Sequence, residues 1–232
     1  VVGGRALYDA IGPFLKASVH GNYAIHIPFT KSLNMSAGLG LGWSNFGIRE
    51  DRVVLHQADD VSYSEFLGNT SAQNILDVNA GITLYGKNLF VGISTTQLLK
   101  NKTQFGDVET QSNFNRHYFL IAKYQIKLGE ELSIEPTVVG KIVQNSPLAA
   151  DFGARLIYKK GAWFGIQYRT SNALTFQVGA NLIKNIYISY GYELGIGQLR
   201  TANNGTHEVQ LGFYLGKNRN LDKEIKEGNT EE

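Results

Sequence analysis

The chain has 232 residues, a formal net charge of +2, 26 glycines, 12 tyrosines, 12 phenylalanines and no cysteine. The absence of cysteine excludes a disulfide framework and thiolate metal sites, and the small net charge, without any basic run, gives no support for nucleic-acid binding. No window approaches the roughly 18 uninterrupted apolar residues of a membrane helix, whereas abundant glycine and aromatic residues without helical periodicity are typical of an all-β protein.

Alternation of apolar and polar residues with a period of two runs along most of the chain and predicts strands. Phe164, Ile166 and Tyr168, for example, alternate with glycine, glutamine and arginine. We expect twelve strands, at residues 1–7, 15–29, 35–47, 75–85, 89–98, 116–128, 133–143, 149–159, 162–169, 173–183, 186–196 and 206–215.

The length of these strands favours a membrane protein over a soluble one. Strands of soluble sandwiches usually run about five or six residues and turn their apolar face inward. Membrane-barrel strands need about 9–11 residues and turn their apolar side chains outward to lipid. We therefore expect an antiparallel transmembrane β-barrel as a single domain over residues 1–216, followed by a charged tail, 217–232, that is disordered.

The connections between the expected strands separate into two sets that alternate along the chain. One set is short throughout, and the other contains every long connection, including 48–74 and 99–114. Bacterial barrels have short periplasmic turns and longer extracellular loops, so this separation predicts an outer-membrane location. The loop 48–74 is the strongest candidate for binding a partner, with a mobile surface loop as the alternative.

Six short motifs follow one another along the chain: Ile11-Gly12-Pro13, Tyr23 to Pro28, Arg116 to Leu120, Leu132 to Pro136, Trp163 to Thr170 and Gly205 to Glu208. In this order and spacing, and over residues 7–215, they resemble the PorP/SprF family of type IX secretion system outer-membrane proteins of the Bacteroidota. The resemblance implies a role in protein secretion, in cell-surface attachment of cargo adhesins through their C-terminal domains, or in coupling to periplasmic motor components that support gliding motility. Family members have a longer N-terminus with a signal peptide, so we expect the present start to be incomplete and the full barrel to have fourteen strands.

Nine ionisable side chains are expected to point into the barrel lumen. Their mixed signs favour a salt-bridge network that braces or fills the barrel, and the alternative is a pathway that reads the charge of a solute. The nine are Asp77, Lys123, Glu135, Lys141, Asp151, Arg155, Arg169, Glu193 and Glu208.

Six aromatic residues near strand ends fit the girdles that barrels place at the two membrane interfaces, with ordinary core packing as the alternative. They are Trp43, Tyr118, Trp163, Phe164, Tyr187 and Phe213. The glycines of the strand 35–47 are expected to let a bulky lumenal group approach the barrel wall.

No residue pattern indicates catalysis. His20 and His26 share a face but lie about 20 Å apart at roughly 3.3 Å per residue, so they cannot chelate one metal ion. Serine and histidine show no spacing that selects a catalytic triad, and no glycine-rich phosphate loop is present. We therefore expect no enzyme activity, cofactor or metal, and a barrel in the lipid bilayer that binds protein partners. The alternatives are a transport barrel for small or hydrophobic solutes, a soluble β-sandwich and a membrane-embedded hydrolase.

Overall fold

The computed structural model describes residues 1–49, 52, 72–99, 102–103, 112–113, 115–159, 161–183, 186–197 and 204–213. Most of them lie in strands of one antiparallel sheet. The bounds are β1 Val2–Ile11, β2 Phe14–Pro28, β3 Leu33–Ile48, β4 Ala72–Gly86, β5 Leu89–Thr96, β6 Lys102–Thr103, β7 Ser112–Asn113, β8 His117–Tyr124, β9 Ile126–Lys127, β10 Leu132–Val143, β11 Ala149–Tyr158, β12 Ala162–Arg169, β13 Ala173–Ile183, β14 Ile186–Gly195 and β15 Thr206–Phe213.

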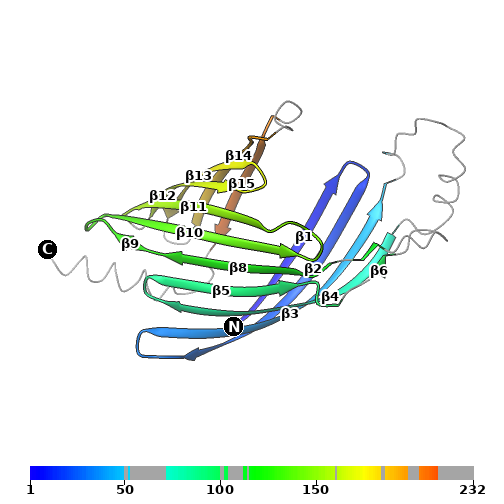
Figure 1. Cartoon of the computed structure of the whole chain (residues 1–232), viewed down its shortest axis with the longest axis horizontal. Coiled ribbons are helices and arrows are strands. Elements are labelled where there is room, and N and C mark those ends of the chain that lie inside the picture. Colours follow the sequence, from blue (N-terminus) through cyan, green and yellow to red (C-terminus); the bar gives the residue numbers. More distant parts are fainter. Residues whose placement is uncertain are drawn as a thin grey trace, which may run out of the picture. The chain divides into compact units, whose positions relative to one another are not determined.

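The order of hydrogen-bonded strands follows the order of the chain, β1-β2-β3-β4-β5-β8-β10-β11-β12-β13-β14-β15, as the colours of Figure 1 illustrate. Short β9 pairs with β10, and β6 and β7 form a separate two-stranded sheet. Within the described residues, the twelve strands of the main path are the twelve that the sequence predicts, because β8 and β9 together occupy the expected strand 116–128. The all-β antiparallel class is therefore confirmed.

The chain divides into two compact units. Unit 1 comprises residues 1–121 and 140–148, and unit 2 comprises 122–139 and 149–232. Strands β8 and β10 contribute residues to both units. The expected loop 48–74 lies outside the described residues over 53–71, as do most of the loop 99–114 and all of the expected tail 217–232.

The described part of the chain contains no helix with both the length and the apolar character needed to cross a membrane.

The first hairpin differs from the prediction. The sequence predicts a strand at 1–7 and a connection at 8–14, but β1 continues to Ile11 and pairs with Phe14 across the two-residue turn Gly12-Pro13. Gly12 has a φ of +56°, a left-handed conformation that glycine adopts without steric cost. The connection between the first two strands is therefore a tight turn, although it belongs to the alternating set that contains the long connections.

The two faces of the sheet have inverted burial relative to a soluble protein. In each unit one face, here called the apolar face, exposes large hydrophobic side chains, among them Leu41 at 71% and Phe164 at 50%. Glycines apart, the buried residues of the described chain are mostly polar or charged: Ser18, His20, Ser36, Ser44, Asp77, Ser133 and Asp151 against Ile75 and Ala173. This opposite face is called the polar face. A sheet that exposes hydrophobic side chains and buries polar ones is suited to a lipid environment.

The glycines of β3 make room for polar side chains of β2. A Cβ built on Gly42 would lie inside the His20 imidazole, and one on Gly40 would overlap the side-chain amide of Asn22. The β2–β3 register places His20 opposite Gly42 and Asn22 opposite Gly40. The expectation that these glycines admit a neighbouring polar-face group therefore matches the local packing.

Candidate functional site

The register of β11 to β14 brings three of the nine predicted ionisable residues together in unit 2. Asp151 of β11 lies directly opposite Arg169 of β12. Arg169 in turn faces Ala173 of β13, whose small side chain is 8% exposed. Glu193 of β14 pairs with Thr175, two residues beyond Ala173 on the same face. The small residue at 173 lets the long arginine side chain reach across β13.

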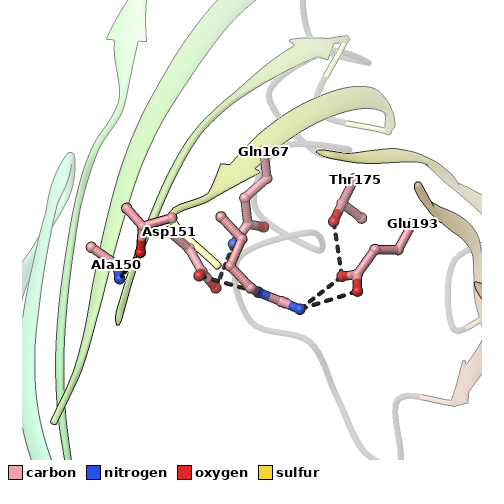
Figure 2. Close-up of polar contacts among 7 residues, drawn as sticks. Ala150, Asp151, Gln167, Thr175 and Glu193 are labelled. Atoms are coloured by element: carbon pink, nitrogen blue, oxygen red, sulfur yellow. Dashed lines mark hydrogen bonds and ion pairs between the residues drawn. The ribbon is translucent and has the colours of Figure 1, made fainter. Parts of the chain in front are cut away.

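The Arg169 guanidinium bridges two carboxylates, and the three residues are called the Arg169 network. Its Nε lies 3.3 Å from Asp151 Oδ1, and its Nη1 lies 2.9 Å from Glu193 Oε2. Two neutral side chains complete the contacts, as Figure 2 shows. Gln167 Nε2 donates to Asp151 Oδ2 at 3.0 Å, and Thr175 Oγ1 donates to Glu193 Oε2 at 3.2 Å.

The burial of the Arg169 network agrees with the predicted role of a salt-bridge network that braces the wall. The Asp151 side chain is only 3% exposed, whereas those of Arg169 and Glu193 are about one-third exposed. A buried carboxylate is stable only when its charge is paired and its oxygens accept hydrogen bonds. Both Asp151 oxygens do so, and the network joins strands β11, β12 and β14 through polar side chains.

The other predicted ionisable residues have the following places and contacts. Lys123 Nζ and Glu135 Oε2 are 3.9 Å apart on neighbouring strands β8 and β10. Arg155 stacks over the Trp163 ring at 4.0 Å from the ring centroid. The Asp77 carboxylate accepts hydrogen bonds from the backbone N–H groups of Val78 and Gln97, in unit 1. Lys141 lies on β10 and Glu208 on β15.

A cavity of about 580 Å³ opens on the polar face of unit 2. Arg155 and Glu208 contribute opposite charges to its wall, and Gln177, Ser189 and Gln210 contribute neutral polar groups. Ser189 Oγ donates to Gln210 Oε1 at 3.2 Å. This wall mixes both signs of charge, whereas pores that select ions by charge use rings of one sign.

The predicted aromatic girdle is divided between the two faces. Four of its six members, Trp43, Tyr118, Phe164 and Phe213, lie on the apolar face with more than two-fifths of their surface exposed. Trp163 and Tyr187 instead lie on the polar face, because Trp163 alternates with Phe164 and Tyr187 with Ile188. Each packs on a glycine of the adjacent strand, Trp163 on Gly179 and Tyr187 on Gly212. A lipid-facing girdle therefore stays a prediction for the other four residues only.

Replacing Gly179 by alanine is expected to destabilise the protein by about 1–3 kcal/mol, the usual cost of overpacking. A Cβ at this position would lie 2.6 Å from the Trp163 ring, and Arg155 covers that ring. The matched control is Gly195→Ala on β14, where a Cβ meets nothing within 4 Å. Equilibrium unfolding in lipid vesicles measures both variants, and equal midpoints for the two would contradict the packing of Trp163 on Gly179.

Lys159 and Glu131 form an exposed ion pair outside the strands, with Nζ and Oε1 3.0 Å apart and both side chains 57% exposed. The hydrogen bond to Glu131 raises the pKa of the Lys159 ammonium, and Tyr158 acts in the same direction. The pair therefore contributes below the ordinary pKa of lysine and is lost only as the pH rises through the raised value. Because solvent screens exposed pairs, we expect Lys159→Gln to leave the unfolding midpoint at neutral pH unchanged. A clear drop would show that the pair is stronger than its exposure allows.

The two neutral residues that hydrogen bond to the Arg169 network were not singled out from the sequence. Gln167 and Thr175 look like ordinary polar strand residues. The β11–β12 pairing brings Gln167 to Asp151, and the β13–β14 pairing places Thr175 opposite Glu193. The sequence offers one partial indication that Gln167 lies near the network. Gln167 and Arg169 are two residues apart on one strand, so their side chains share a face.

Comparison with known proteins identifies the family. The chain matches the model of the family described as type IX secretion system membrane protein PorP/SprF over residues 1–213. Among solved structures it is similar to the toluene transporter TbuX of Ralstonia pickettii, with 13% identity, a TM-score of 0.46, and coverage of 87% of this chain and 68% of that one. A mutant of the Rh. blastica porin matches with 7% identity, a TM-score of 0.29, and coverage of 92% and 99%. The search of curated proteins gave no match.

The family description agrees with the structure. It names a membrane protein of a secretion system and not an enzyme, and the sheet has an exposed apolar face on strands long enough to cross a bilayer. Strands that cross a bilayer in this way are a feature of bacterial outer membranes. The chain therefore belongs to the PorP/SprF family and is an outer-membrane component of the type IX secretion machinery.

Proposed function

We propose that this protein acts without catalysis, by binding other proteins of type IX secretion. Its partners are the C-terminal domains of secreted surface adhesins, periplasmic motor components that support gliding, or both. Family membership over residues 1–213 is the observation that carries the proposal. The segment 48–74 is the proposed contact for a partner, since long loops on rigid scaffolds carry binding functions.

The charges of the polar face support a scaffold more than a solute pathway. Arg169 is held between two carboxylates, and Lys123 lies beside Glu135. Charges that are committed to partners within the wall brace neighbouring strands and are less available to a passing solute. A rigid wall suits a protein that presents loops to a partner.

Affinity purification from gently solubilised envelopes, followed by mass spectrometry, tests the proposal. We expect a large repetitive adhesin or periplasmic secretion-motor proteins to accompany the full chain. A matched variant in which residues 53–71 are replaced by a short glycine–serine linker is expected to reach the membrane and to lose the adhesin.

Recovery of the protein alone, together with steady ion conductance in a planar bilayer, would overturn the proposal. That combination would favour the transport of small or hydrophobic solutes. Loss of partners from the loop variant accompanied by loss of the protein from the membrane would indicate misfolding, and proteinase accessibility at the cell surface separates the two cases.

A further inference from the structure

A second cavity, of about 240 Å³, lies on the polar face of unit 1 and has no part in the Arg169 network. Strands β1, β2 and β4 supply most of its polar wall. The residues that matter for its chemistry are Arg5, Lys16, Ser18, His20, Asp77 and Asn79. A water molecule occupies about 30 Å³ of liquid, so the cavity has room for several waters or one small organic molecule.

Strand pairing aligns charged residues of this cavity in one row. Arg5 lies opposite His20, His20 opposite Gly42, and Gly42 opposite Asp77. Because Gly42 has no side chain, the His20 imidazole occupies the space above it. Arg5, Lys16 and Asp77 all lie close enough to His20 to act electrostatically on its ring.

Several buried polar atoms in this wall have no hydrogen-bond partner. They are Ser18 Oγ, His20 Nδ1 and Asn79 Oδ1. Ser18 is 3% exposed and His20 is 8% exposed, so both side chains are more than nine-tenths buried. Buried polar groups of native proteins are nearly always paired, and unpaired ones that line a cavity indicate a missing partner. Since both Ser18 Oγ and His20 Nδ1 are unpaired, no hydrogen bond activates the serine as a nucleophile.

The charges that line this cavity indicate which kind of ligand it would bind. Arg5 and Lys16 are cationic, whereas Asp77, the one carboxylate among the described residues of the wall, already accepts two backbone hydrogen bonds. Asp9 lies opposite Lys16 in the β1–β2 pairing and partly balances it, so Arg5 is the principal cation. A planar guanidinium beside hydroxyl and imidazole donors matches the oxygens of a carboxylate or a phosphate.

We propose that this cavity binds a small anion that carries a carboxylate or a phosphate group. Arg5 supplies the opposing charge, and the Ser18 hydroxyl and His20 Nδ1 donate hydrogen bonds to the anion. Asn79 Oδ1 accepts a hydrogen bond from a hydroxyl or amino group on the same ligand. The site is separate from the proposed protein-binding role and does not depend on it.

Calorimetric titration of the full protein in detergent tests the site, with inorganic phosphate and succinate as probes and ionic strength held constant with sodium chloride. We expect saturable binding of at least one probe. Phosphate alone would assign the site to phosphorylated ligands, succinate alone to carboxylates, and binding of both to oxyanions generally. Absence of saturable binding for both probes would overturn the proposal.

Variants locate the binding within the molecule. Arg5→Gln is expected to weaken binding about tenfold or more, because it removes a charge-assisted hydrogen bond. Ser18→Ala is expected to weaken it less. Lys159→Gln, which removes one positive charge outside the cavity, is the matched control and is expected to bind like the unmodified protein. If Arg5→Gln lacks the far-UV circular dichroism of the folded protein, Lys16→Gln takes its place. Unchanged affinity in a folded Arg5→Gln, or an equal loss in Lys159→Gln, would contradict the assignment.

Discussion

Replacing Arg169 by methionine is expected to lower the free energy of unfolding by about 3 kcal/mol. Breaking a buried ion pair from one side typically costs about 3–5 kcal/mol, because the remaining charge stays buried without compensation. Asp151, at 3% exposure, would lose its ion pair with Arg169 and keep its hydrogen bond from Gln167. The lower end of the range applies because the Arg169 side chain is 32% exposed and solvent screens part of its charge. Methionine keeps much of the aliphatic length of arginine, so the loss reports on charge.

The matched experiment removes the charges of Asp151 and Arg169 together. Asp151→Asn combined with Arg169→Gln leaves neutral groups that are able to hydrogen bond, and we expect it to recover at least half of the loss. Equilibrium unfolding in lipid vesicles, followed by the fluorescence of the two tryptophans, measures both variants. If the single and double variants are equally unstable, Arg169 contributes through packing and the charge argument fails.

Replacing Leu41 by arginine is expected to destabilise the protein by about 2–4 kcal/mol in a bilayer, the range for a cationic residue near the midplane on the lipid face of a barrel. Leu41 lies near the middle of β3, on the apolar face, with 71% of its surface exposed. On a water-facing surface the same exposure would predict an effect within about 0.5 kcal/mol. The experiment therefore distinguishes a lipid-facing surface from a water-facing one.

The control for Leu41→Arg places an arginine on the polar face. Gln210 of β15 lies there in an exposed position, and we expect Gln210→Arg to cost much less than the Leu41 variant in the same vesicles. Folding efficiency into vesicles, read from gel mobility with and without heating, provides an independent measurement. Equal costs for the two variants would mean that the apolar face does not contact lipid.

The polar face combines two kinds of site with different chemistry. In unit 2 both carboxylate oxygens of Asp151 accept hydrogen bonds, so we expect this network to contribute to stability. In unit 1 the atoms of Ser18 and His20 face a cavity without partners. Both the Arg169 network and the unit 1 cavity lie on polar faces that the same apolar–polar alternation predicts. That alternation therefore does not distinguish a stabilising network from a binding site. Hydrogen-bond satisfaction makes the distinction.

Within the described residues, the twelve strands of the main path could be read from the sequence, whereas β6 and β7 fall in the expected loop 99–114. Period-two alternation is a property of the chain itself, and it places Ile166 on one face and Gln167 on the other whatever lies next to them. The twelve strands of the main path and their antiparallel order follow from this local pattern and the short connections. The first turn was missed because Tyr8, Asp9 and Ala10 continue the alternation weakly, and only their pairing with β2 shows that β1 includes them.

Contacts between strands were decided by the tertiary structure. Register determines that Arg169 meets Asp151 and reaches Glu193 past a small alanine, and that Arg5, His20 and Asp77 share one row. Trp163 packs on Gly179 of the next strand, and this contact cannot be read along a single strand. The sequence by itself determined the strands, their faces and the membrane-protein class, since each depends on local periodicity. The tertiary structure decided which polar groups are paired and which remain open to a ligand, because those contacts join residues far apart in the chain.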